Sequence, residues 1–106
     1  MNLEEVLKRI REARDKYDTL KLSLVPDQME ILRELSVCYS FLSDFRIDAK
    51  EEHNNFYFQS NGKSHASKER EADKQCPELY LIRRSMESTK VLIEAVRSTL
   101  SGAKNA

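Results

Sequence analysis

The sequence predicts an all-α protein, a three-helix arrangement built on a long antiparallel helical hairpin. Only two glycines and two prolines occur in 106 residues, of which 34% are charged and 40% are apolar. This composition is typical of long helices with narrow apolar stripes. The last third of the chain adds a heptad seam, whose 3.5-residue period excludes a flat strand and predicts coiled-coil-like packing. The seam residues, separated by alternating steps of three and four, are Leu79, Ile82, Met86, Thr89, Ile93, Val96 and Leu100.

The first helix is expected over residues 3–20. The alternation of Leu20, Leu22 and Leu24 predicts that the helix frays there. Pro26 should then end it, because a proline disfavours the α conformation of the residue before it. The apolar stripe that should face the hairpin consists of Leu3, Val6, Leu7, Ile10, Ala13 and Tyr17.

The second helix is expected over residues 27–58, a length of about 45 Å at ~1.5 Å per residue. Asp27 and Glu30 have the spacing of a capping box at its start. Residues 60–64, Ser-Asn-Gly-Lys-Ser, form the clearest loop signal in the chain and should follow it. The stripe that should pack against the last helix consists of Ile31, Leu35, Cys38, Leu42, Phe45, Ala49 and Phe56.

The third helical segment is expected over residues 67–101, with Ser67 as its N-cap. Pro77 predicts a break or kink in this segment, with Cys76 as the joint. Gly102 suits the position that follows a helix end. Together the three segments predict a single helical domain covering residues 1–106.

Cys38 and Cys76 are expected to remain reduced. Reversing the chain at Gly62 places Cys76 opposite a residue near Ala49 and Cys38 opposite one near Glu87. The two cysteines are then about eleven residues, or ~16 Å, apart along the hairpin, whereas bridged Cα atoms lie about 4.4–6.8 Å apart. Reduced cysteines and the lack of a signal peptide predict a cytoplasmic protein. No apolar run approaches the ~20 residues that would cross a membrane, so no membrane association is expected.

The sequence predicts neither a metal site nor a cofactor nor catalysis. Cys38, His53, His65 and Cys76 are separated by gaps of 15, 12 and 11, and zinc sites use much closer ligand pairs. A nucleophilic pair of His65 and Cys76 lacks a neighbouring group that would orient the histidine. Cys38 also belongs to an apolar stripe, which indicates a core residue.

Four cations of the last helix are candidate binding residues: Arg83, Arg84, Lys90 and Arg97. Three of them recur every seven residues and therefore share one side of the seam. They could contact a phosphate backbone. Pairing with carboxylates of the second helix or of a partner is the favoured interpretation. Residues 27–62 have seven acidic and three basic side chains (net −4), and residues 77–106 have three and five (net +2).

The aromatic run Phe56-Tyr57-Phe58 lies at the expected end of the second helix, near Lys63. Aromatic rings beside cations can stack on unpaired bases. The favoured interpretation is that the three rings form a hydrophobic cap where the hairpin turns. The rings are candidate binding residues only if they face solvent together with the cations of the last helix.

Residues 62–101 contain three recognisable stretches: Gly62-Lys63-Ser64 with Ser67-Lys68-Glu69-Arg70-Glu71-Ala72, then Pro77-Glu78-Leu79-Tyr80, and finally Val96-Arg97-Ser98-Thr99-Leu100-Ser101. This pattern resembles small helical accessory proteins from the early, replication and recombination regions of tailed phages and prophages. In such proteins a K-S/T-x-x-E-R-E-A-like stretch precedes a long coiled helix. The resemblance implies an accessory or host-directed binding protein in the host cytoplasm, and it implies no catalytic residues.

These observations predict a non-enzymatic protein that acts by helix-mediated protein–protein interaction. The target would be a host or phage protein of replication or recombination, and the chain itself is expected to form a homo-oligomer through its apolar seams. The main alternative is a factor that binds single-stranded nucleic acid, and a component of virion assembly is a further one. A net charge of zero predicts that any nucleic-acid binding is weak.

Overall fold

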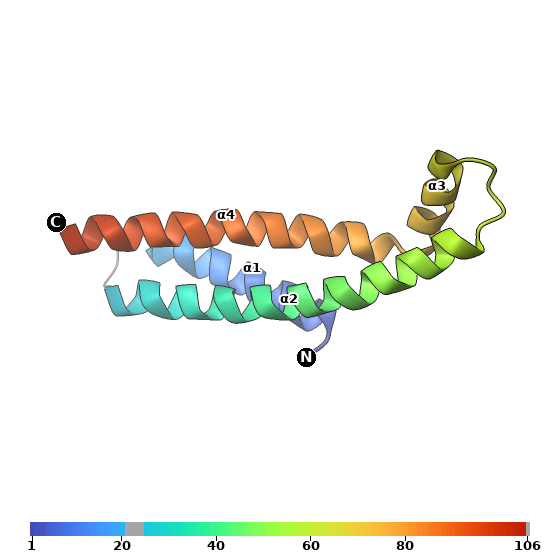
Figure 1. Cartoon of the computed structure of the whole chain (residues 1–106). Coiled ribbons are helices and arrows are strands. Elements are labelled where there is room, and N and C mark those ends of the chain that lie inside the picture. The colour runs from blue at the N-terminus through green and yellow to red at the C-terminus, as the bar shows by residue number, and fades with distance from the viewer. Residues whose placement is uncertain (21–24, 106) are drawn as a thin grey trace.

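The computed structural model describes residues 1–20 and 25–105, and every regular element in that part of the chain is a helix (Figure 1). The helices are α1 (Leu3–Leu20), α2 (Val25–Gln59), α3 (His65–Gln75) and α4 (Pro77–Asn105). The predicted all-α class is therefore confirmed. The third predicted segment consists of two helices, because α3 ends and α4 begins on either side of Cys76.

Helices α2 and α4 run antiparallel and pack along much of their length, as the sequence predicts for a hairpin (Figure 1). This pair gives the molecule its elongated shape of 60 × 25 × 18 Å. Helix α1 lies along the hairpin, and the short α3 is set across the end where α2 leads into the loop (Figure 1).

The main apolar cluster joins three helices. Helix α1 contributes residues from its predicted stripe, and α2 and α4 contribute the stripes that face each other across the hairpin. Since α3 supplies no buried residue to this cluster, the body of the protein is formed by α1, α2 and α4. The buried members are Val6, Ile10, Ala13, Ile31, Leu35, Cys38, Leu42, Leu92, Ile93, Val96 and Leu100.

All seven residues of the α4 heptad seam are buried or half-buried within the chain itself. Thr89 is fully buried, and its hydroxyl donates a hydrogen bond to the Ser85 carbonyl oxygen at 2.6 Å. A threonine is tolerated in the seam because its own helix satisfies the hydroxyl while its methyl packs. The seam is thus covered by α2 and α1, and a homo-oligomer would have to use another surface.

The start of α2 differs from the prediction. Val25 is the first helical residue, so the expectation that Pro26 excludes it from the helix is wrong. A proline is tolerated in a first helical turn, because the N–H groups there have no partner within the helix. Asp27 lies inside this turn rather than at the N-cap, where it still suits the helix dipole. The alternating Leu22 and Leu24 lie outside the described residues.

Helix α3 begins earlier than predicted. Its N-cap is Ser64 rather than Ser67, and the Ser64 side chain accepts a hydrogen bond of 3.1 Å from the Ser67 backbone N–H. Ser67 is therefore the donor of the capping bond. At the other end, Cys76 has non-helical dihedral angles, and its N–H bonds to the Ala72 carbonyl at 2.9 Å.

The C-terminal end of α4 also differs from the prediction. The helix passes through Gly102 and continues to Asn105, so the expected end at Ser101 is wrong. A glycine ends a helix when it adopts the left-handed conformation, and Gly102 does not have a positive φ. Nothing in the local packing forces the chain to turn at this position, since no other group lies within 4 Å of where a Gly102 Cβ would be.

A second, smaller apolar cluster lies where α3 meets the hairpin. Cys76 is 4% exposed, and its Sγ lies 3.5 Å from the Ala49 carbonyl oxygen. This contact is the pairing that reversal of the chain at Gly62 predicts. Both cysteines are free and buried, Cys38 in the main cluster and Cys76 in this one. The buried members of the second cluster are Ala49, Cys76, Leu79 and Ile82.

Candidate functional site

The surface that most resembles a binding site is a row of exposed residues on α2, opposite the buried stripe. Its members follow one another at steps of three and four, so they align along one side of the helix. All seven are exposed, and three are apolar: Val37 is 40% exposed, Ile47 59% and Phe58 77%. We call this surface the outer row of α2; it consists of Val37, Ser40, Asp44, Ile47, Glu51, Asn54 and Phe58.

The four cations of α4 do not pair as expected. Arg83, Arg84, Lys90 and Arg97 are all exposed, and none of them forms an ion pair with a carboxylate of the described residues. Pairing with α2 is therefore not seen among the described residues, and pairing with a partner, the other part of the favoured interpretation, stays a prediction. Among the described residues, the arginine that pairs with a carboxylate of α2 is Arg9 of α1, which bonds to Glu34.

The aromatic run divides into residues with different surroundings. Phe56 is half-buried and packs against the second apolar cluster, as a cap would. Tyr57 is half-buried and has an edge-to-face contact with Phe58, at 5.4 Å between ring centroids. Phe58 extends into solvent. Arg97 lies 20 residues along α4 from Pro77, roughly 30 Å away, so the rings and the far end of the cation row do not form one compact patch.

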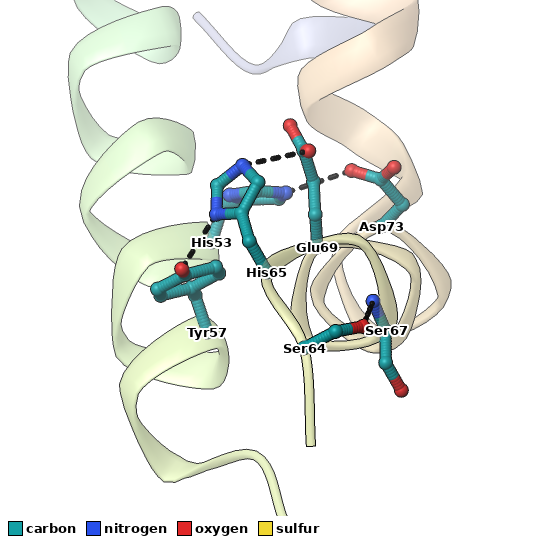
Figure 2. Close-up of polar contacts among 7 residues, drawn as sticks. All are labelled: His53, Tyr57, Ser64, His65, Ser67, Glu69 and Asp73. Atoms are coloured by element: carbon teal, nitrogen blue, oxygen red, sulfur yellow. Dashed lines mark hydrogen bonds and ion pairs between the residues drawn. The ribbon is translucent and has the colours of Figure 1, made fainter. Parts of the chain in front are cut away.

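A cluster of polar contacts joins α3 to the last turns of α2 (Figure 2). His53 donates from Nε2 to Asp73 Oδ1 at 2.7 Å. His65 Nε2 lies 3.3 Å from Glu69, and its Nδ1 lies 2.6 Å from the Tyr57 hydroxyl. A carboxylate can only accept, so in neutral His65 the proton is on Nε2 and Nδ1 accepts from Tyr57.

Two further polar contacts strengthen the same junction. The Ser60 hydroxyl donates to the Glu71 carboxylate, and the Lys68 ammonium lies over the Tyr57 ring at 5.8 Å from its centroid. Gly62 permits the close approach of the loop to α3, because a Cβ at this position would lie 2.9 Å from Ser67 Oγ and 3.0 Å from the Lys68 nitrogen. The loop and α3 therefore fit together closely.

Apolar burial contributes little to the attachment of α3. Ala72 is its one buried residue, and a buried methyl group is worth about 1 kcal/mol. Exposed ion pairs contribute at most about 1 kcal/mol each. An isolated helix of fewer than ~12 residues is itself marginal in water. The attachment of α3 is consequently weaker than the packing of the three long helices.

The two cysteines and two histidines of the chain are separated in the structure and do not form a zinc site among the described residues. His53 faces Asp73, His65 faces Glu69 and Tyr57, and the two cysteines lie in different clusters. Within residues 1–20 and 25–105, no group of three or more histidine, cysteine, aspartate or glutamate side chains is arranged to hold a metal ion. The histidine contacts escape sequence reasoning because they depend on how α3 docks, and the only signal for them is the local spacing of His65 and Glu69.

None of the helices in the described part of the chain combines the length and apolar character needed to cross a membrane. Comparison with models of known protein families, with curated proteins and with solved structures gave no match to this chain.

Proposed function

We propose that this chain is a non-enzymatic, phage-type accessory protein that binds a partner protein through the outer row of α2. The observation that carries the proposal is the exposure of Val37, Ile47 and Phe58 along one line of a helix whose opposite side is buried. The line from Val37 to Phe58 spans 21 residues, about 31 Å at ~1.5 Å per residue. A helix that lies along it would remove all three apolar side chains from water.

The charge on α2 indicates the chemistry of the partner. Asp44 and Glu51 lie one turn on either side of Ile47 within the outer row. Residues 27–62 have a net charge of −4, from seven acidic and three basic side chains. We therefore propose a partner helix with an apolar stripe flanked by lysine or arginine, because complementary charge favours association and orients it.

Site-specific photo-crosslinking tests this proposal. A photoreactive benzoylphenylalanine replaces Ile47 in one variant and Val91, which is 62% exposed on α4, in the control. Both variants are irradiated in a nuclease-treated lysate of the bacterial host. We expect a discrete crosslinked protein from position 47 and none from position 91. The crosslink should disappear when Asp44→Lys and Glu51→Lys are added, whereas equal labelling from both positions would contradict the proposal.

A second copy of this chain is the alternative partner for the same surface. Light scattering of the purified chain at micromolar concentration distinguishes it, and a crosslink from position 47 to a second copy would identify the chain as its own partner. The seam of α4 is not available for this association, because it is buried within the chain.

A second candidate, binding of single-stranded nucleic acid, is favoured by the unpaired cations of α4. Arg83, Lys90 and Arg97 are exposed without ion pairs among the described residues. Glu87 and Glu94 are exposed on the same helix and would repel phosphate. We rank this function below protein binding for that reason.

The two free thiols support a reducing compartment, so we propose the host cytoplasm as the location.

A further inference from the structure

Helix α3 covers one end of the molecule without belonging to its body. The main cluster contains buried residues of α1, α2 and α4, and no residue of α3 packs against it. Helix α3 instead lies next to the second cluster, to which the chain joint supplies Cys76 and the hairpin supplies Ala49 and Leu79. No residue of α3 belongs to this cluster, but Glu69 and Asp73 of α3 line one pocket together with Cys76 and Leu79. Removing α3 would therefore open the second cluster on the side of Cys76 and Leu79 and leave the main cluster intact.

The attachment of α3 to α2 is almost wholly polar. Apart from the Ala72 methyl, it consists of the His53–Asp73 and Tyr57–His65 contacts (Figure 2), the Ser60–Glu71 bond and the Lys68 ammonium over the Tyr57 ring. His65, Glu71 and Asp73 are exposed, and their partners are half-buried, so water competes for the same hydrogen bonds.

The two connections of α3 allow it to move as a unit. On one side residues 60–63 precede its N-cap, Ser64, and on the other side Cys76 is the single residue between α3 and α4. The Cys76 N–H bonds to Ala72 within α3 itself, so displacement of α3 breaks no hydrogen bond inside α4.

We propose that α3 is a detachable cap, which opens away from α2 while the body of α1, α2 and α4 stays folded. Opening exposes the Cys76 thiol and the apolar surface around Ala49 and Leu79. The inference is independent of the proposed partner, because it rests on the contacts of α3 alone. Local openings of this kind have smaller free energies than global unfolding, which makes them separately measurable.

The two cysteines provide separate reporters for the cap and the body. Cys38 is fully buried in the main cluster, and Cys76 is buried beside α3. Burial raises the pKa of both thiols, so reaction with a thiol reagent requires exposure. Variants Cys38→Ala and Cys76→Ala each leave a single thiol to follow.

The experiment measures the reaction of each single-thiol variant with 5,5′-dithiobis(2-nitrobenzoate) in the absence of denaturant. Each rate is divided by the rate for the same variant unfolded in urea. We expect Cys76 to react at least tenfold faster than Cys38 on this scale. Equal protection of the two thiols would show that α3 opens only when the whole protein unfolds, and would overturn the proposal.

Two sets of substitutions separate opening from direct access to a thiol near the surface. His53→Gln with Asp73→Asn removes a cap contact and should speed the reaction of Cys76 several-fold while leaving Cys38 unchanged. Ile93→Val, a mild change in the body, should speed Cys38 and leave Cys76 unchanged. If Cys76 does not respond to loss of the cap contact, or if both thiols respond together to Ile93→Val, the cap does not open as proposed.

Discussion

Tyr17 of α1 and Thr99 of α4 are joined by a hydrogen bond of 2.9 Å between their hydroxyl groups. Thr99 also lies 3.1 Å from the Ala95 carbonyl, to which it donates. The Thr99 oxygen is then free to accept from Tyr17. This contact links the first helix to the last, across 82 positions of sequence.

Replacement of Tyr17 by phenylalanine should lower the free energy of unfolding by about 1 kcal/mol, the usual contribution of a hydrogen bond. Thr99→Val should have a similar effect. Urea unfolding of the two single variants and the double variant gives the coupling between them. Strict additivity of the two losses would show that the hydroxyl groups do not interact.

Ile93→Asp should unfold the protein, whereas Lys90→Ala should leave its melting temperature nearly unchanged. Ile93 is 9% exposed in the main cluster, and a carboxylate there would be buried without a partner, at a cost of several kcal/mol. Lys90 is exposed and has no ion pair within the described residues. Thermal melts followed by circular dichroism test this; two equally stable variants would contradict the seam assignment.

The two glycines should respond in opposite directions to substitution by alanine. Gly62→Ala should destabilise the protein, because the new Cβ would lie 3.0 Å from a backbone atom of Lys68 that cannot easily move. Gly102→Ala should stabilise it by up to about 1 kcal/mol, since Gly102 is helical and has open space around it. Destabilisation by both changes, measured by urea unfolding, would disagree with this account.

The buried Cys38 thiol predicts a loss of stability in alkali. Burial, assisted by the charge of Glu34, raises the pKa of Cys38 above its ordinary value of 9.0. Its stabilising contribution is therefore complete below about pH 9 and is lost as the pH rises through the folded-state value. The stability difference between the wild type and Cys38→Ala should be constant below about pH 9 and shrink as the pH rises above it, as urea unfolding at each pH would measure. A constant difference would argue against a raised pKa.

Nucleic-acid binding, if it occurs, should be weak and sensitive to salt. Three or four phosphate contacts from Arg83, Arg84, Lys90 and Arg97 release few counterions, so binding should fall away between about 50 and 200 mM salt. Gel shifts with single-stranded DNA test this. Sub-micromolar affinity at physiological salt, abolished by Arg83→Glu with Arg97→Glu, would instead make nucleic-acid binding the primary function.

The long-range arrangement of the hairpin could be predicted because it follows from apolar periodicity and one strong loop signal. Those two features were enough to pair Cys76 with Ala49. The exact ends of the helices were less predictable. Ser64 and Ser67 are chemically equivalent candidates for the N-cap of α3, and only the loop geometry selects between them. Pro26 was misread because a proline stops one helix and starts another equally well.

The candidate binding surfaces were harder to predict than the core. Periodicity identifies the side of a helix that is buried, but it does not show which exposed charges find partners. The cations of α4 were expected to pair with α2, while Arg9 of α1 forms the ion pair with Glu34. In the sequence, the apolar residues of the outer row of α2 stand out only as single apolar residues among polar ones. Single exposed apolar residues are common on protein surfaces and do not by themselves indicate a binding site.

The single-residue joint at Cys76 has a consequence for how this chain tolerates changes of length. One residue inserted beside Cys76 would lengthen the non-helical joint by up to about 3.6 Å and would change the direction in which the chain leaves α3. Asp73 would then no longer lie opposite His53, and the buried Ala72 would be displaced from the hairpin. An insertion in the loop at residues 60–64 alters only the path between two helix ends. Length variation among descendants of this sequence should therefore accumulate at the loop and be excluded at the joint.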